Sequence, residues 1–159
     1  MESTSVAART EPVDLAALFS DLVRLEIELW ERVDRRLRRD HDLPLTWFEP
    51  MQVMDRVADC RVADVAEQLS ITVGGVSKLV DRIERAGWCG RAPNPNDARS
   101  SVLVLTRPGR KVLRAARRSC DHELEAQLRP AVSPPRLASF AATVRDLRRH
   151  LDAEPAMAS

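Results

Sequence analysis

The sequence predicts a mainly α-helical fold with one small β-hairpin, and three observations lead to that prediction. Apolar residues recur at helical spacing through most of the chain, and strand signals replace the helical period only in residues 88–106. Coiled-coil-like seams lie near both ends of the chain, whereas basic residues gather in its middle. With 159 residues, of which 44% are hydrophobic and 31% charged, the chain is long enough for one domain with its own core.

The first predicted helix covers residues 13–40. Its seam repeats spacings of 3, 4, 3 and 4 residues, as the a and d positions of a coiled coil do, and its members are Leu15, Leu18, Leu22, Leu25 and Leu29. Residues 1–12 are small and polar and end in proline, so we expect a flexible tail without the apolar segment of a signal peptide.

Shorter helices follow a break at residues 41–45. Thr46 and Glu49 form a capping-box pattern, so the next helix is expected to begin at Thr46. Two short helices are then predicted over residues 62–69 and 72–86, because their apolar residues recur on one face.

The strand signals begin after Gly87, which is expected to end the last of these helices. Strands are predicted over residues 88–92 and 100–106, and the turn-forming residues 93–97 join them into a hairpin with a long loop. A helix follows over residues 108–128, with a proline in its first turn, where proline is tolerated.

The last helix is predicted to begin at Ser133 and to precede a second flexible tail over residues 153–159. It repeats the spacings of 3, 4, 3 and 4, and the members of this second seam are Leu137, Phe140, Val144, Leu147 and Leu151. Because neither seam has a partner within a small domain, both terminal helices are expected to pair with a second chain.

Residues 62–86 fit a helix-turn-helix unit, in which two short helices cross steeply around a tight turn. Ala66 supplies the small residue that such a crossing needs, Val76 can pack beneath it, and Thr72 can cap the second helix. A helical hairpin used only for packing would have the same spacing. The β-hairpin that follows favours the winged, DNA-binding variant.

The basic charge is concentrated around this unit. Residues 70–118 contain eleven Lys and Arg but three Asp and Glu, a net charge of +8, whereas the rest of the chain has 14 basic and 21 acidic residues, a net charge of −7. A nearly neutral protein divided in this way is expected to present a polyanion-binding face. An ordinary solvated helix surface is the alternative that a charge count leaves open.

The sequence also resembles the MarR family of winged helix-turn-helix transcriptional regulators. The segments that carry the resemblance are LPLTWFE (43–49), VADVAEQLSIT (62–72), GVSKLVDRIERAGW (75–88) and NPNDARSSVLVLTRPGRKVL (94–113). The resemblance implies a single domain over residues 13–152, with a winged-helix lobe at 46–106 flanked by dimerisation helices at 13–40 and 108–152. It further implies a homodimer that binds a pseudo-palindromic double-stranded DNA operator, represses nearby genes and is released by a small-molecule effector or an oxidant.

The predicted recognition helix would place its N-terminal residues in the major groove. Its expected DNA contacts are Thr72, Val73, Gly74, Gly75, Ser77, Lys78 and Arg82. Lys78 is expected to bond guanine or phosphate, Val73 a thymine methyl group, and Arg82 phosphate, unless Arg82 pairs within its helix. The two glycines cost about 1.5–2 kcal/mol of helix stability together, and we interpret them as letting the backbone approach DNA closely. Val73 and Gly74 depart from the family pattern.

The wing residues are Asp97, Arg99 and Ser100. The resemblance assigns Arg99 to the minor groove, whose negative potential attracts arginine. Asp97 is expected to orient Arg99 through a charge-assisted hydrogen bond, to bond the backbone of its own turn, or both.

The sequence leaves open two ways in which DNA binding could be regulated. A ligand cleft between the lobe and the dimer helices could be lined by Trp30, Trp47, Phe48 and Arg56, although the aromatic members also fit a plain core. The alternative is a redox switch at Cys89, which lies in a basic stretch where positive charge would lower the pKa of the thiol.

Several function classes are excluded or disfavoured. The sequence has no nucleophile–base, phosphate-loop or metal-ligand pattern, so we expect no enzyme, no metal and no cofactor. No apolar run approaches the roughly 18 residues that span a bilayer, so we expect a cytoplasmic protein that joins the nucleoid when bound to DNA. A winged helix that binds proteins and not DNA is the competing interpretation, and the basic middle of the chain argues against it.

Overall fold

The computed structural model describes residues 12–153, apart from the side chains of Ala98 and Arg99. The predicted tails, residues 1–12 and 153–159, lie outside this range except at their inner ends. Ala153 is the last residue of the final helix and not part of a tail.

The elements follow the predicted order of four helices, a hairpin and two helices. In the described part of the chain they are α1 (Leu15–His41), α2 (Leu45–Arg56), α3 (Val62–Leu69), α4 (Val73–Arg85), β1 (Cys89–Asn94), β2 (Asp97–Leu105), α5 (Arg107–Leu128) and α6 (Pro134–Ala153). The predicted mainly helical fold with a small hairpin wing is therefore confirmed.

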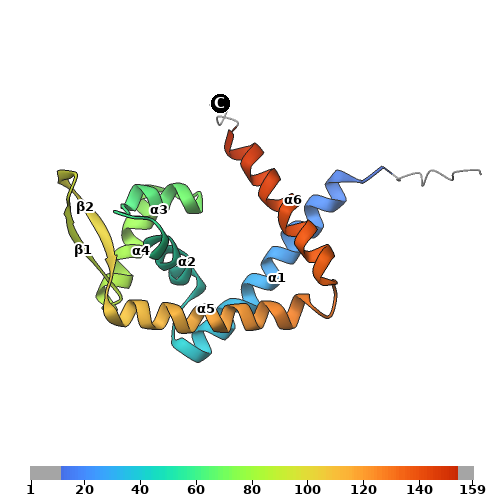
Figure 1. Ribbon diagram of the computed structural model, residues 1–159, viewed down its shortest axis with the longest axis horizontal. Helices are drawn as coiled ribbons and strands as arrows, with labels where there is room; N and C mark the ends of the chain where they lie inside the picture. Colours follow the sequence, from blue (N-terminus) through green and yellow to red (C-terminus); the bar gives the residue numbers. More distant parts are fainter. Residues whose placement is uncertain (1–11, 154–159) are drawn as a thin grey trace, which may run out of the picture.

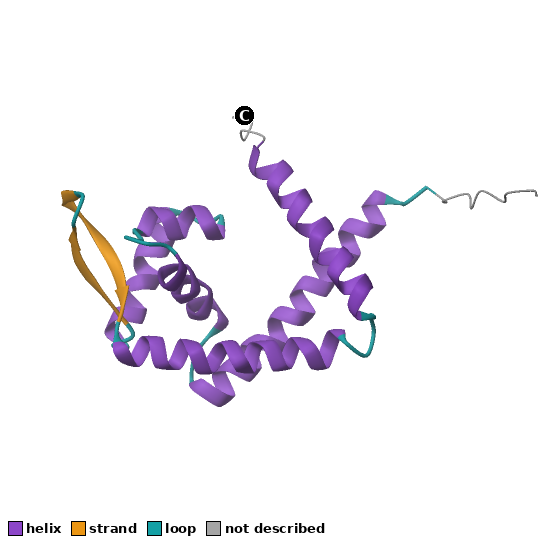
Figure 2. Ribbon diagram, in the orientation of Figure 1, coloured by secondary structure: helices purple, strands orange, loops and turns teal. Residues whose placement is uncertain are grey.

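Figure 1 shows how these elements are arranged. The hairpin lies at one end of the molecule beside α3 and α4, and α1 and α6 lie at the other end. The long helix α5 runs along one edge and connects the two ends, with α2 between α5 and α3. Figure 2, coloured by secondary structure, makes the hairpin stand out as the one sheet among the described residues.

The core lies in the lobe formed by α2, α3, α4 and the hairpin. Its largest fully buried side chains include Phe48, Met51, Ile83 and Leu113. The second half of α1 joins this core, because its residue Leu37 is completely buried. Burial of this kind, and not helix propensity alone, holds short helices such as α3 in place.

The start of α2 differs from the prediction. The helix begins at Leu45, with Pro44 as the N-cap residue and no side-chain cap from Thr46. The carboxylate of Asp34, on α1, instead accepts a hydrogen bond of 2.7 Å from the backbone N–H of Leu45. The predicted capping box is therefore wrong, because a residue from another helix satisfies the free N–H group and Glu49 bonds Gln52.

The hairpin is also tighter than predicted. Its strands continue to Asn94 and from Asp97, so only two residues separate them, and the predicted long loop is wrong. The side chain of Asn94 explains the tight turn, because it accepts from the backbone N–H of Asn96 at 2.9 Å and donates to Ser100 Oγ at 2.8 Å. At the other end of the hairpin, Cys89 pairs with Leu105.

The terminal helices leave a broad apolar surface uncovered. In the first half of α1, Leu15 and Phe19 are 73% and 68% exposed, and no residue of α6 is buried. The exposed large apolar side chains of α6 are Phe140, Val144, Leu147 and Leu151, which are four of the five predicted seam positions. Monomeric proteins rarely expose contiguous apolar surfaces of this extent. Among residues 12–153, no helix is both long and apolar enough to cross a membrane.

Candidate nucleic-acid interface

The turn between α3 and α4 has the geometry of a helix-turn-helix unit without the glycine often found there. Ser70 adopts the left-handed conformation, with φ of 54°, and ends α3. The N–H of Ile71 then donates to the carbonyl of Ala66 at 3.0 Å. Ala66 and Val76 are both buried in the core cluster, as the predicted helix crossing requires.

Helix α4 divides sharply into a buried and an exposed face. Val76, Val80 and Ile83 are completely buried, so this face fixes the helix on the lobe. On the opposite side Lys78 is exposed, and Val73 is 55% exposed at the N-terminal end of the helix. The N-terminal end of α4 is therefore available to a partner.

The N-terminal turn of α4 is held by the predicted cap. Thr72 Oγ1 accepts a hydrogen bond of 3.2 Å from the N–H of Gly75. This use of the acceptor leaves the hydroxyl proton of Thr72 for a further bond. A neighbouring residue that sequence reasoning missed is Ile71, which is 44% exposed on the approach to Val73. The sequence feature that could have indicated this residue is an apolar side chain within a turn.

Both acidic residues of α4 are paired with one arginine from the wing. Arg91 on β1 lies 2.8 Å from a carboxylate oxygen of Asp81 and 3.5 Å from one of Glu84. In the described part of the chain, Lys78 and Arg82 have no carboxylate within 4.0 Å. The intrahelical pairing that was the alternative for Arg82 is therefore not found, and both cations remain available to an anionic partner.

The two glycines of α4 differ in their surroundings. A Cβ atom added to Gly75 would lie 3.1 Å from Thr72 Oγ1, so a side chain there would crowd the cap. A Cβ atom added to Gly74 would meet nothing within 4 Å. A substitution of Gly74, and not of Gly75, can therefore separate an effect on the approach of DNA from an effect on folding.

Gly74→Ala is expected to raise the free energy of unfolding by up to about 1 kcal/mol, because alanine has the higher helix propensity and its methyl group meets no neighbour. It is also expected to weaken operator binding, since the methyl group would stand on the surface that approaches DNA. Urea denaturation and fluorescence anisotropy with operator DNA measure the two effects. A more stable variant with unchanged affinity would disprove close backbone approach at this position.

The structure describes the side chains of only some of the predicted wing residues. Ser100 holds the turn, because its hydroxyl accepts from Asn94 and lies 3.3 Å from the carbonyl oxygen of Asp97, to which it donates. The side chain of Arg99 is outside the described part of the chain, so its pairing with Asp97 stays a prediction. The wing tip is tied to the lobe through Asn96, which donates to the carboxylate of Asp59 at 3.4 Å.

Comparison with known proteins points to one family. The sequence model of the MarR family matches residues 55–101, from the end of α2 into β2. The multiple antibiotic resistance protein MarR of Salmonella typhimurium is 27% identical over 118 residues, which are 70% of this chain and 81% of that protein. These matches support a MarR-family winged-helix regulator. A second relative, the uncharacterized HTH-type transcriptional regulator YfiV of Bacillus subtilis, is 26% identical over 73 residues, 46% of either chain.

Solved structures confirm the fold. Sco3205 of Streptomyces coelicolor, a MarR family transcriptional regulator in complex with DNA, superposes with a TM-score of 0.78 at 22% identity and covers 93% of both chains. CouR of Rhodococcus jostii, bound to p-coumaroyl-CoA, gives a TM-score of 0.72 at 18% identity, over 84% of this chain and 91% of CouR. The MarR-family homologues are transcriptional regulators and not enzymes, which agrees with the expectation from the sequence.

The structure does not support one cleft formed by the four predicted residues. Phe48 is 2% exposed in the core, and Trp47 packs edge-on against Trp88 with ring centroids 5.7 Å apart. Arg56 is exposed and donates to Gln68 at 3.3 Å. Of the four, Trp30 lines a hollow of about 370 Å³ between α1, α2, α5 and α6, together with Glu49 and Cys120.

The predicted activation of Cys89 is wrong. Burial, and to a smaller extent the nearby Glu84, raise the pKa of its thiol to about 11 against an opposite effect of Arg91. Burial likewise raises the pKa values of Cys60 and Cys120 to about 11. Because the thiolate is the reactive form, none of the three cysteines has the low pKa that marks a redox sensor.

Proposed function

We propose that this MarR-family chain is a homodimeric transcriptional repressor that binds a pseudo-palindromic operator near its own gene. The observation that carries the proposal is the charge arrangement on α4. Arg91 neutralises both acids of the helix, whereas Lys78 and Arg82, beside the open surface at Gly74, form no ion pair with any described residue. Such an end suits the major groove, where lysine bonds guanine or phosphate and apolar side chains contact thymine methyl groups.

The exposed seams of α1 and α6 support the homodimer. They are apolar, nearly continuous and carried by the two terminal helices, as an interface between identical chains requires. A two-fold symmetric dimer would place two α4 helices in successive turns of the major groove, about 34–36 Å apart. The relative Sco3205, with the same fold and bound to DNA, supports this arrangement.

A small apolar effector is the switch that the chain supports best. The hollow at Trp30 is bounded by both the lobe and the terminal helices, so a ligand there would alter how the two parts meet. Burial raises the pKa of the Glu49 carboxyl group in its wall. CouR, which shares the fold, binds p-coumaroyl-CoA.

A gel shift with the DNA upstream of the gene tests the proposal directly. We expect a retarded complex with two protein chains per duplex that survives competition by excess scrambled DNA. A transcription assay from the same DNA then tests repression. The proposal would be contradicted if scrambled DNA competed for the protein as well as unlabelled operator DNA does. It would also be contradicted if the protein formed a complex only with another protein.

Lys78→Ala is expected to cost about 1–3 kcal/mol of operator binding, because Lys78 is an exposed cation on the reading surface. If Lys78 reads guanine, the loss should be concentrated at one base position of a substituted operator series. An equal loss on every sequence would make it a phosphate contact. Arg35→Ala, which removes an exposed charge from α1, is the matched control and should leave affinity nearly unchanged.

A further inference from the structure

Helix α5 carries a row of cations on the side that faces away from the core. Its members, here called the α5 outer face, are Arg107, Lys111, Arg114 and Arg118, all of them exposed. At about 3.6 residues per turn, their spacings of 4, 3 and 4 place them within an arc of about 60°. The buried residues of α5, Gly109, Leu113 and Ala116, lie on the opposite side.

This row has no counterions of its own. Residues 106–120 contain six basic residues and no acidic one. Arg117 pairs with Asp55 at 2.7 Å and Arg110 donates to the carbonyl of Leu105, but no carboxylate lies within 4.0 Å of the four members of the outer face among the described residues.

Several arginines on α1 and α6 pair with acids three or four residues away. Arg38 with Asp34 on α1 and Arg149 with Asp146 on α6 are examples. Like charges at these spacings destabilise a helix, so the unbalanced row on α5 weakens the isolated fold. An anionic partner would relieve that repulsion.

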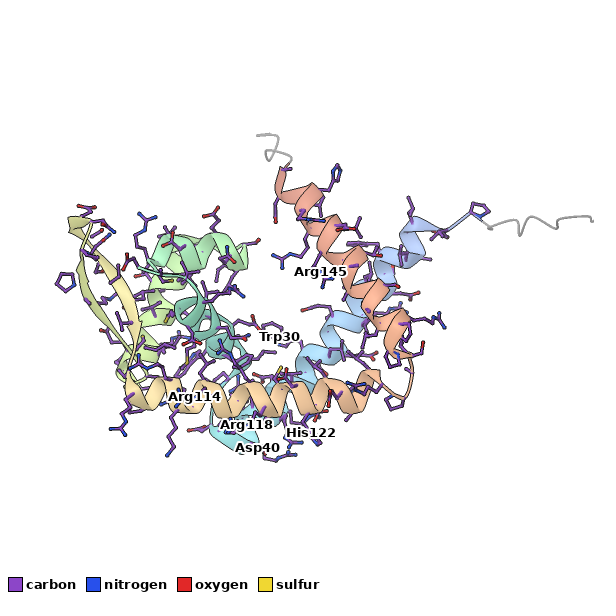
Figure 3. The ribbon with its side chains drawn as sticks, viewed as in Figure 1. Trp30, Asp40, Arg114, Arg118, His122 and Arg145 are labelled. Carbon is purple, nitrogen blue, oxygen red and sulfur yellow. The ribbon has the colours of Figure 1, made fainter. Side chains whose placement is uncertain are left out.

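We propose that the α5 outer face binds the phosphate backbone of a second DNA duplex while α4 and the wing hold the operator. The inference rests on the proposed function. The outer face is remote from the reading surface, because α2 packs against α5 on one side and against α3 and α4 on the other. Figure 3 labels Arg114 and Arg118 along α5, from which α2 separates α3. One duplex is therefore not expected to touch both surfaces of a protomer.

The dimensions fit a duplex. From Arg107 to Arg118 the helix rises by about 16 Å, and one DNA strand presents about five phosphates over that length of its axis. Four cations thus face about five anions. The row contains no aromatic side chain on which single-stranded bases could stack, and no apolar anchor of the kind found at the centre of protein interfaces.

The test uses beads that carry the operator selected by the full-length protein. The beads are saturated with protein, washed, and mixed with a fluorescent duplex of scrambled sequence. We expect the protein-coated beads to retain the scrambled duplex. The R114Q/R118Q variant should retain at least about tenfold less, with a log–log salt slope shallower by about 0.9 for each lost phosphate contact. R145Q/R148Q, which removes two exposed charges from α6, is the matched control and should retain as much as wild type.

The outcomes separate this inference from the proposed function. If wild-type protein does not bind the operator beads, the proposed function fails before the second duplex is added. If it binds the operator but retains no scrambled duplex, or if R114Q/R118Q retains as much as wild type, the role of α5 is overturned. Preferential retention of labelled polyglutamate would also overturn it, because an acidic protein would then be the better partner.

Discussion

Leu147→Glu is expected to separate the dimer and to weaken operator binding by about a hundredfold or more. Leu147 is 55% exposed on α6, so the substitution leaves the fold of the single chain intact. In the dimer the seam would be buried, and an unpaired carboxylate there is strongly unfavourable. A monomer also loses the gain of about 10²–10⁴ that two linked half-site contacts provide.

Sedimentation equilibrium and operator titration measure the two effects of Leu147→Glu. Arg149→Gln is the matched control, since it changes the charge of the same helix by the same amount at an exposed position on the side opposite the seam. The control should remain a dimer with wild-type affinity. A Leu147→Glu protein that dimerises and binds operator normally would exclude the α6 seam from the interface.

Gly109→Ala is expected to destabilise the fold by about 3 kcal/mol. A Cβ atom at this position would lie 1.9 Å from the carbonyl oxygen of Trp88 and 2.8 Å from its carbonyl carbon. The same carbonyl accepts a hydrogen bond of 3.0 Å from the N–H of Thr106, whose hydroxyl donates to Gly87 at 2.7 Å. These bonds join the base of the wing to the start of α5, so the clash cannot be relieved by rotating one side chain.

Urea denaturation of Gly109→Ala checks this expectation, and Gly74→Ala is its natural control. Both are glycine-to-alanine changes near the start of a helix, but Gly74 faces open space and Gly109 faces a backbone carbonyl. The two variants should therefore shift the free energy of unfolding in opposite directions. Equal shifts would show that close packing at Trp88 does not decide the outcome.

Local patterns predicted most of the lobe. The limits of α3, the cap of α4 by Thr72 and the end of α4 before Gly87 all depend on neighbours within a few residues, so they can be read from the sequence. The start of α2 could not, because its N–H group is satisfied by Asp34, eleven residues earlier on another helix. The tight hairpin depends on both ends of the Asn94 side chain, which the turn composition alone did not indicate.

The candidate site was predicted unevenly for the same reason. The exposed end of α4 follows from helical periodicity, whereas the pairing of Arg91 with two acids of α4 depends on how the wing folds back. The pKa of Cys89 was predicted from nearby charge, but burial dominates it. Phe48 was assigned to a cleft although it fills the core. In each case tertiary packing, which the sequence pattern does not specify, decided the result.

Selection of bound sequences from a random duplex library by the purified full-length protein tests the central claim most directly. A symmetric dimer with one recognition helix per chain predicts an inverted repeat whose half-sites are centred about 10 base pairs apart. A single asymmetric motif, or no enrichment over the starting library, would contradict the account.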